Sequence, residues 1–221
     1  MAELITMVIS DIRKFVSQQT ELMFNEGDFQ LQLGVFLRQS KRYDAVHVEY
    51  YIPNDLAAKA GYDWDSNLYI DIVCRKDGEY IPIELKYPTK LVVKNARRFG
   101  MLVEDVPLMR NQGAQNLVKY NFWKDVRRIE IIKHLFRDVH SGVAVMLTND
   151  SSYTRPVRSS SACFPFSTAE GIEAGGATMD WLGNPAVRRD HTPFVLDGKY
   201  RIAWTEHLID DEKFYLTIIT I

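Results

Sequence analysis

The sequence predicts one mixed α/β domain, an α+β fold with a mixed sheet, that spans residues 1–221. Three stretches repeat apolar residues at helical spacing, short apolar or alternating runs separate and follow them, and no internal repeat is present. Hydrophobic residues make up 46% of the 221 residues and charged residues 25%, which is enough to bury one ordinary core.

The first part of the chain predicts two helices and a strand. Residues 4–24 carry apolar side chains at helical spacing, and a second such stretch predicts a helix over 28–39. Residues 45–52, AVHVEYYI, alternate as a strand that Pro53 ends. The segment 54–66 has the composition of a loop or a short helix.

The middle of the chain predicts a β-hairpin, a long helix and a buried strand. Strands over 67–75 and 79–87 flank a turn signal that contains Asp77-Gly78. Residues 89–111 are mixed and partly basic, without a regular period. An amphipathic pattern over 112–137 predicts a long helix, and the apolar run 142–148 predicts a central strand.

The last third divides into loops and strands. Residues 151–192 are polar and glycine-containing, and we expect loops with a short helix, the least regular part of the chain. Three apolar runs within 193–221 predict a C-terminal β-meander that extends the sheet or forms a small lobe. The last run, FYLTIITI, predicts an apolar edge strand through which a homodimer could pair.

Bulk properties narrow the class of protein. A net charge of −2 does not fit a protein that coats nucleic acid with a basic surface, although an enzyme with a local basic patch remains compatible. Cys74 and Cys163 form neither a metal-binding spacing nor a disulfide framework, which favours the cytoplasm. Early charges such as Asp11 argue against a signal peptide, and no apolar run approaches the ~20 residues of a membrane span.

Three polar residues on the predicted hairpin are the most informative feature. Asp71 lies in NLYIDIVC, and Glu84 and Lys86 lie in YIPIELKYP. Residues two apart on a strand face the same way, so pairing of the hairpin would bring two carboxylates and an ammonium together. Two close carboxylates repel unless a cation lies between them, and oxygen ligands suit Mg²⁺ or Mn²⁺.

A charged, solvent-facing ladder on an antiparallel sheet is the alternative interpretation of these residues. Two details favour a functional site. Aspartate is disfavoured in strand interiors, yet Asp71 stands between Ile70 and Ile72. Glu84 and Lys86 also occupy the most apolar stretch of their region.

The Asp71…Glu84-Leu85-Lys86 pattern resembles the PD-(D/E)xK nuclease superfamily, also called restriction-endonuclease-like. The α-β-β-β-α-β core of that family would cover residues 24–150, with its elements at 28–39, 45–52, 67–75, 79–87, 112–137 and 142–148. Ile70 stands where many members have proline, a departure that the family tolerates.

The resemblance implies a metal-dependent nuclease that hydrolyses phosphodiester bonds in nucleic acid, with DNA as the expected partner. Asp71 and Glu84 would bind Mg²⁺ or Mn²⁺, and Lys86 would assist the attacking water. A further metal ligand from the first core helix would be Glu26, with Asp28 as the alternative.

The resemblance also implies a supporting polar residue on the helix after the Glu-x-Lys strand, for which Gln112 and Gln115 are the candidates. The basic residues that follow Lys86 are the candidates for contacts with phosphates. They are Lys90, Lys94, Arg97 and Arg98.

Two other functions stay open at this point. The chain could be a non-catalytic member of the same fold, which acts as a nucleic-acid-binding or assembly subunit. It could also be a small-molecule enzyme with residues 151–192 as a lid. The five histidines have no zinc-binding spacing, and no phosphate-binding glycine loop or GxSxG nucleophile motif is present.

Overall fold

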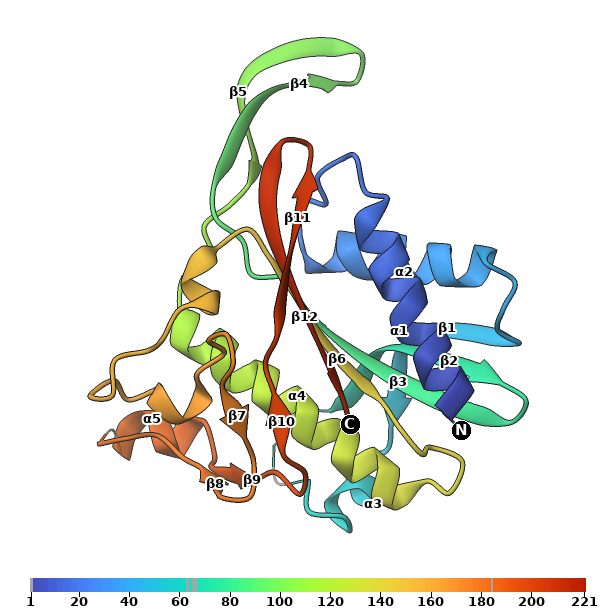
Figure 1. Ribbon diagram of the computed structural model, residues 1–221, viewed down its shortest axis with the longest axis vertical. Helices are drawn as coiled ribbons and strands as arrows, with labels where there is room; N and C mark the ends of the chain where they lie inside the picture. Colours follow the sequence, from blue (N-terminus) through green and yellow to red (C-terminus); the bar gives the residue numbers. More distant parts are fainter. Residues whose placement is uncertain (1, 63, 65–66, 184) are drawn as a thin grey trace.

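The computed structural model describes residues 2–62, 64, 67–183 and 185–221 (Figure 1). Within this part of the chain it contains five α-helices around a six-stranded mixed sheet. The helices are α1 (Ala2–Ser17), α2 (Glu26–Gln39), α3 (Asn54–Ala58), α4 (Gln115–Leu135) and α5 (Pro185–Asp190). The strands of the main sheet are β1 (Ala45–Ile52), β2 (Leu68–Lys76), β3 (Glu79–Lys86), β6 (Val143–Thr148), β11 (Trp204–Ile209) and β12 (Glu212–Thr220).

The strands of the main sheet follow the order β1-β2-β3-β6-β12-β11. Neighbouring strands are antiparallel except β3 and β6, which are parallel. A parallel pair needs a crossover, and α4 provides it. The predicted mixed sheet in an α+β protein is therefore confirmed.

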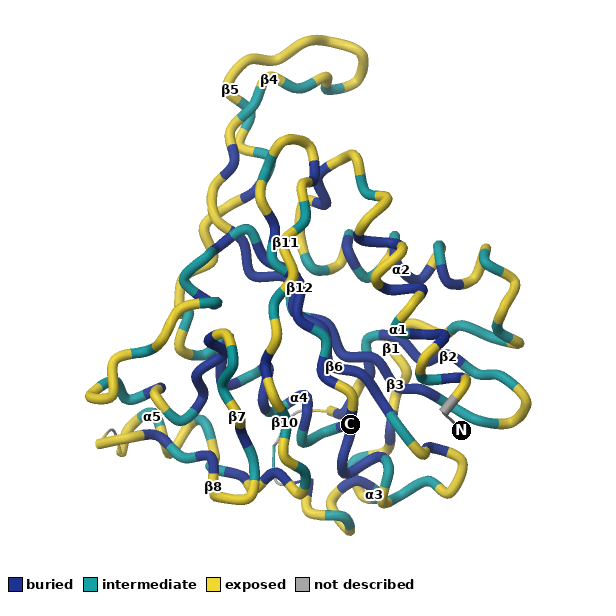
Figure 2. The backbone as a smooth tube through the Cα atoms, viewed as in Figure 1, coloured by how far each residue is buried: buried dark blue, intermediate teal, exposed yellow. Residues whose placement is uncertain are grey.

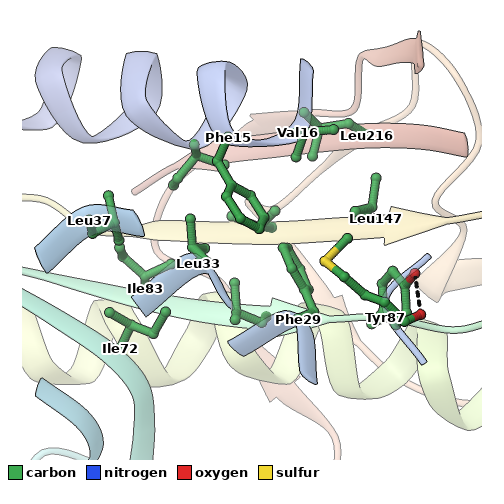
Figure 3. Packing of buried hydrophobic residues seen from close by; sticks show 14 of the residues in the cluster. Phe15, Val16, Phe29, Leu33, Leu37, Ile72, Ile83, Tyr87, Leu147 and Leu216 are labelled. Atoms are coloured by element: carbon green, nitrogen blue, oxygen red, sulfur yellow. Dashed lines mark hydrogen bonds between the residues drawn. The ribbon is translucent and has the colours of Figure 1, made fainter. Parts of the chain in front are cut away.

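Helices cover both faces of this sheet. Residues Val143, Val145 and Leu147 of β6 join the core under α1 and α2, whereas Ala144 and Met146 join the core against α4. Figure 3 shows the first of these cores, where side chains of α1 and α2 pack on the sheet. Burial on both faces explains why the β6 sequence is continuously apolar instead of alternating.

Most predicted elements are present with small shifts at their ends. Strand β1 has the predicted bounds, and the predicted helix over 112–137 is α4, which begins at Gln115 and ends at Leu135. The first helix is shorter than expected because it ends at Ser17 instead of residue 24. Asn25 then caps a new helix, since its side chain accepts a hydrogen bond from the amide of Asp28.

The prediction for the last strand was wrong in one respect. The FYLTIITI strand, β12, is not an edge strand, because it pairs with β6 on one side and β11 on the other. The C-terminal strands do extend the sheet, and β11 forms its edge. Strands β9 (Phe194–Val195) and β10 (Tyr200–Arg201) instead pair with β8 (Thr178–Met179) and β7 (Glu173–Ala174) in small separate sheets.

Two segments are more ordered than the sequence indicates. The mixed segment 89–111 forms a two-stranded ribbon, β4 (Val92–Arg98) and β5 (Met101–Met109), which projects from the body (Figure 1). Within 151–192, short elements that include 3₁₀ turns pack aromatic residues such as Phe166 and Trp181 against α4. No helix in the described residues has the length and apolar character that a membrane crossing requires.

Candidate active site

The candidate site lies where β2 and β3 separate. The last residues in register are Ile72 and Ile83, so Asp71 and Glu84 are the next pair across the two strands. Beyond this point β2 continues beside β1, and β3 continues beside β6. Oδ2 of Asp71 accepts a hydrogen bond of 2.6 Å from the main-chain amide of Leu85. Where the two strands separate, this side-chain oxygen takes the place of a main-chain carbonyl.

Glu84 and Lys86 point together toward α4, whereas Leu85 between them is buried in the core under α1 and α2. The Glu84 side chain is 1% exposed, and its Oε1 lies 3.2 Å from Nη1 of Arg128. Nζ of Lys86 lies 2.6 Å from Oδ2 of Asp125. The predicted convergence of Asp71, Glu84 and Lys86 is therefore present in the structure.

Helix α4 contributes a carboxylate and a guanidinium that the sequence analysis did not select. Nη1 of Arg128 lies 3.1 Å from Oδ1 of Asp125, and Nη2 of Arg128 donates to the carbonyl of Tyr69 on β2. Asp125 stands among apolar positions on the buried face of α4. A carboxylate on the buried face of a helix needs a charged partner. The position of Asp125 in the amphipathic pattern of α4 therefore already indicated a buried charged group.

Glu26 reaches the same site from the first turn of α2. Its Oε2 accepts a hydrogen bond of 2.9 Å from the amide of Tyr87, one residue after Lys86. Asp28, the alternative ligand, instead accepts from the amide of Phe24 and serves the start of the helix. The structure thus favours Glu26 over Asp28 as the acidic residue that α2 brings to the site.

Burial dominates the electrostatics of the three carboxyl groups. Desolvation raises the pKa values of Glu26 and Asp71, and Lys86 opposes this increase in both cases. The pKa of Glu84 is raised well above its ordinary value, because burial outweighs the charge of Arg128. All three groups therefore hold a proton more readily than an exposed carboxyl group does.

The pKa of Lys86 is shifted in the direction opposite to the one that a catalytic base requires. Burial acts to lower its pKa, but the surrounding carboxylates raise it far above the ordinary range. These carboxylates belong to Asp125, Glu26, Asp71 and Glu84. An ammonium held in this way supplies positive charge instead of accepting a proton.

The oxygen atoms at the site suit a small divalent cation that keeps part of its water shell. Both carboxylate oxygens of Glu84 are buried, Oε1 has an ion pair with Arg128, and the carboxyl group of Asp71 lies directly beside them. No group of three or more acidic, histidine or cysteine side chains among the described residues is arranged to bind a metal. Mg²⁺ commonly binds through only one or two carboxylates, with water and phosphate oxygens as the other ligands, so Asp71 and Glu84 fit it.

The supporting glutamine candidates lie near the start of α4. Gln112 is exposed in the loop before the helix, where its main-chain N–H donates to the carbonyl of Thr89. Nε2 of Gln115 donates to Oδ2 of Asp150 at 2.8 Å. Helix α4 instead brings Asp125 and Arg128 to Glu84, two turns or more farther along.

The four candidate phosphate contacts lie on or before the β4–β5 ribbon. Lys90 forms an ion pair of 2.9 Å with Asp150. Lys94 pairs with Asp210 in the turn between β11 and β12 and with Glu212 at the start of β12. The guanidinium of Arg98 stacks on the Phe24 ring at 5.4 Å. Arg97 is exposed near the tip of the ribbon, where Nη1 donates to the carbonyl of Gly100.

A separate pocket lies between the start of α4 and part of the segment 151–192, which is the lid of the small-molecule-enzyme alternative. Its walls are largely apolar and include Leu117, Ala162 and Trp181, with His191 and Asp190 as the titratable groups. This pocket supplies less chemistry than the charged network at Glu84. Comparison of the chain with protein-family models, with curated proteins and with solved structures found no match.

Proposed function

We propose that this protein is a metal-dependent phosphodiesterase of the PD-(D/E)xK type that hydrolyses nucleic acid, with DNA as the substrate. The observation that carries the proposal is the meeting of Asp71, Glu84 and Lys86 where β2 and β3 separate. Carboxylates at such a point can bind Mg²⁺ or Mn²⁺.

The order of elements around the site supports the same family. Helix α2 is followed by β1, β2 and β3, and then by α4 and the parallel strand β6. Apart from the short helix α3 (Asn54–Ala58) between β1 and β2, this order agrees with the α-β-β-β-α-β order that the resemblance implies, and strand β3 carries the Glu-x-Lys pair. The β4–β5 ribbon is an insertion between β3 and α4, and β11 and β12 are additions after the core.

Each residue of the candidate site has its own role in the proposed reaction. Asp71 and Glu84 would hold the divalent cation, which would supply a Lewis acid and a nucleophile near neutral pH. Lys86 remains an ammonium and stabilises the negative charge that develops on the phosphoryl group. Asp125 positions Lys86 through their 2.6 Å contact, and Arg128 holds Glu84 in place.

A cleavage assay with Mg²⁺ or Mn²⁺ tests this proposal. Linear, circular, single-stranded and branched DNA and RNA are incubated with the protein and with Glu84→Gln and Lys86→Met. Glu79→Gln, which changes the same kind of residue at the far end of β3, is the matched control. We expect metal-dependent cutting that falls at least ~100-fold in both site variants and is kept in the control. Equal cutting by Lys86→Met and the parent protein would refute the assignment.

One observation favours a second candidate, a non-catalytic protein of this fold that binds nucleic acid. Lys86 and Arg128 already contribute two positive charges beside the buried carboxylates, so the fold does not need a metal to balance them. Titration calorimetry with Mn²⁺ separates the two candidates. Binding that Glu84→Gln abolishes supports the enzyme, and no binding together with no cleavage of any substrate supports the second candidate.

A further inference from the structure

The β4–β5 ribbon is joined directly to the strand that carries Glu84 and Lys86. Five residues separate Lys86 from the start of β4, and the chain returns from β5 to the start of α4. Side-chain hydrogen bonds fix the base of the ribbon, because Thr89 donates to the carbonyl of Arg110 and Asn111 accepts from the amide of Leu91. Figure 2 shows that the ribbon is exposed over most of its length beyond this base.

One face of the ribbon is attached to the body and the other is free for a partner. Lys94 and Arg98 alternate on the attached face, where they contact the β11–β12 turn and Phe24. Val93, Arg97 and, opposite Arg97, Leu102 lie on the other face and are exposed. The ribbon is therefore held in one position while it presents its outer face to solvent.

The tip of the ribbon holds Phe99 in a backbone conformation that a phenylalanine rarely adopts. Arg98 pairs with Met101, so Phe99 and Gly100 form a two-residue turn, and both have positive φ values of 50° and 87°. Asparagine or glycine is the usual first residue of such a turn, and a bulky residue there is sterically disfavoured. The Phe99 side chain is also fully exposed, so burial does not compensate.

Exposed apolar side chains are concentrated on this ribbon. Six of the large apolar residues with high exposure lie within 13 residues of the chain, and they are Leu91, Val93, Phe99, Met101, Leu102 and Val103. Such a density on one projecting element indicates a binding surface. Residues 90–110 carry five basic and two acidic side chains, but Lys90 and Lys94 already pair with carboxylates of the body. Arg97 remains on the exposed face of the ribbon, and its charge favours a negatively charged partner.

We propose that the β4–β5 ribbon is an arm that enters a groove of duplex DNA, with Arg97 on a phosphate and Phe99 against the bases. A two-stranded ribbon fits the major groove of B-form DNA, where apolar side chains can contact the methyl groups of thymine. The major groove of duplex RNA is too deep and narrow for such contacts. The choice of nucleic acid as partner rests on the proposed function, and the arm then places the duplex next to Asp71 and Glu84.

Binding without metal tests the arm separately from catalysis. Fluorescence anisotropy measures the affinity for a labelled DNA duplex in EDTA, with duplex RNA and single-stranded DNA as comparisons. Phe99→Ala is matched with Phe164→Ala, since Phe164 is 41% exposed outside the arm. Arg97→Ala is matched with Arg201→Ala, since Arg201 is exposed on β10, at the far end of the molecule from the arm in Figure 1.

We expect each arm variant to weaken duplex DNA binding by about 5-fold to 100-fold, with little change in the controls or in thermal stability. Arg97→Ala should also reduce the slope of log affinity against log salt concentration by about 1. Equal affinity of the arm variants and the parent protein overturns the proposal, as does equal binding of duplex RNA. A dimer in sedimentation that Phe99→Ala dissociates, without an effect on DNA binding, would assign the arm to a second copy instead.

The two proposals fail in different ways. If the protein binds duplex DNA through the arm but cuts no substrate, the nuclease function is wrong and the arm stands. If the protein cuts DNA and the arm variants bind and cut like the parent, the function stands and the arm is wrong.

Discussion

Removal of the Arg128 charge should expose how strongly the site depends on charge balance. In Arg128→Met the side chain keeps much of its volume but no longer pairs with Glu84 and Asp125, at 3.2 and 3.1 Å. Asp125 keeps its contact with Lys86. Glu84, which is 1% exposed, loses the cation closest to it, so most of the destabilisation should come from Glu84.

The magnitude follows from the Glu84–Arg128 distance. Two unit charges 3.2 Å apart at an effective dielectric constant near 20 interact with about 5 kcal/mol. Loss of one partner of a buried pair typically costs ~3–5 kcal/mol, because the other charge remains buried. We therefore expect Arg128→Met to lower the free energy of unfolding by about 3–5 kcal/mol near neutral pH.

The loss should depend on pH in a definite direction. The pKa of Glu84 is already raised by burial, and removal of the guanidinium that lowers it raises it further. The folded variant then binds a proton that the unfolded chain does not, so its stability falls as pH rises through the folded-state pKa. The destabilisation should be smaller at about pH 5.5 than at about pH 7.5.

Urea unfolding at both pH values measures this prediction, with Glu84→Gln and the double variant completing a mutant cycle. Mg²⁺ should stabilise Arg128→Met more than the parent protein if Glu84 binds the cation. A loss below about 1 kcal/mol at neutral pH, or a coupling energy near zero between Glu84 and Arg128, would refute this reasoning.

Two further predictions concern other parts of the fold. Gly142→Ala would place a Cβ 2.4 Å from Cγ2 of the buried Ile129. We therefore expect the free energy of unfolding, measured in urea, to fall by ~1–3 kcal/mol. An unchanged free energy of unfolding would mean that the chain before β6 can move to make room. Burial, together with the charge of Arg128, lowers the pKa of Lys124 to about 8. Amine labelling followed by mass spectrometry measures the labelling rate of Lys124 against pH, and this rate should reach half of its maximum near this pH. The exposed Lys41 is the control for the reagent. A half-maximal rate about two pH units higher would contradict the prediction.

Local patterns in the sequence determined a large part of the fold. The alternation over 45–52 gave β1 its bounds, and the Asp77-Gly78 turn fixed the register that places Asp71 opposite Glu84. The continuous apolar run of β6 predicted a strand that is buried on both faces. Each of these features depends on residues that are close together in the chain, so the spacing alone was sufficient.

The tertiary structure decided which residues meet across long distances in the sequence. Glu84 and Arg128 are 44 positions apart, and only the crossover through α4 brings the guanidinium onto the carboxylate. The position of β12 inside the sheet likewise depends on its pairing with β6. An edge strand and a central strand can have the same apolar pattern, because that pattern records burial of side chains and not the partner of the backbone.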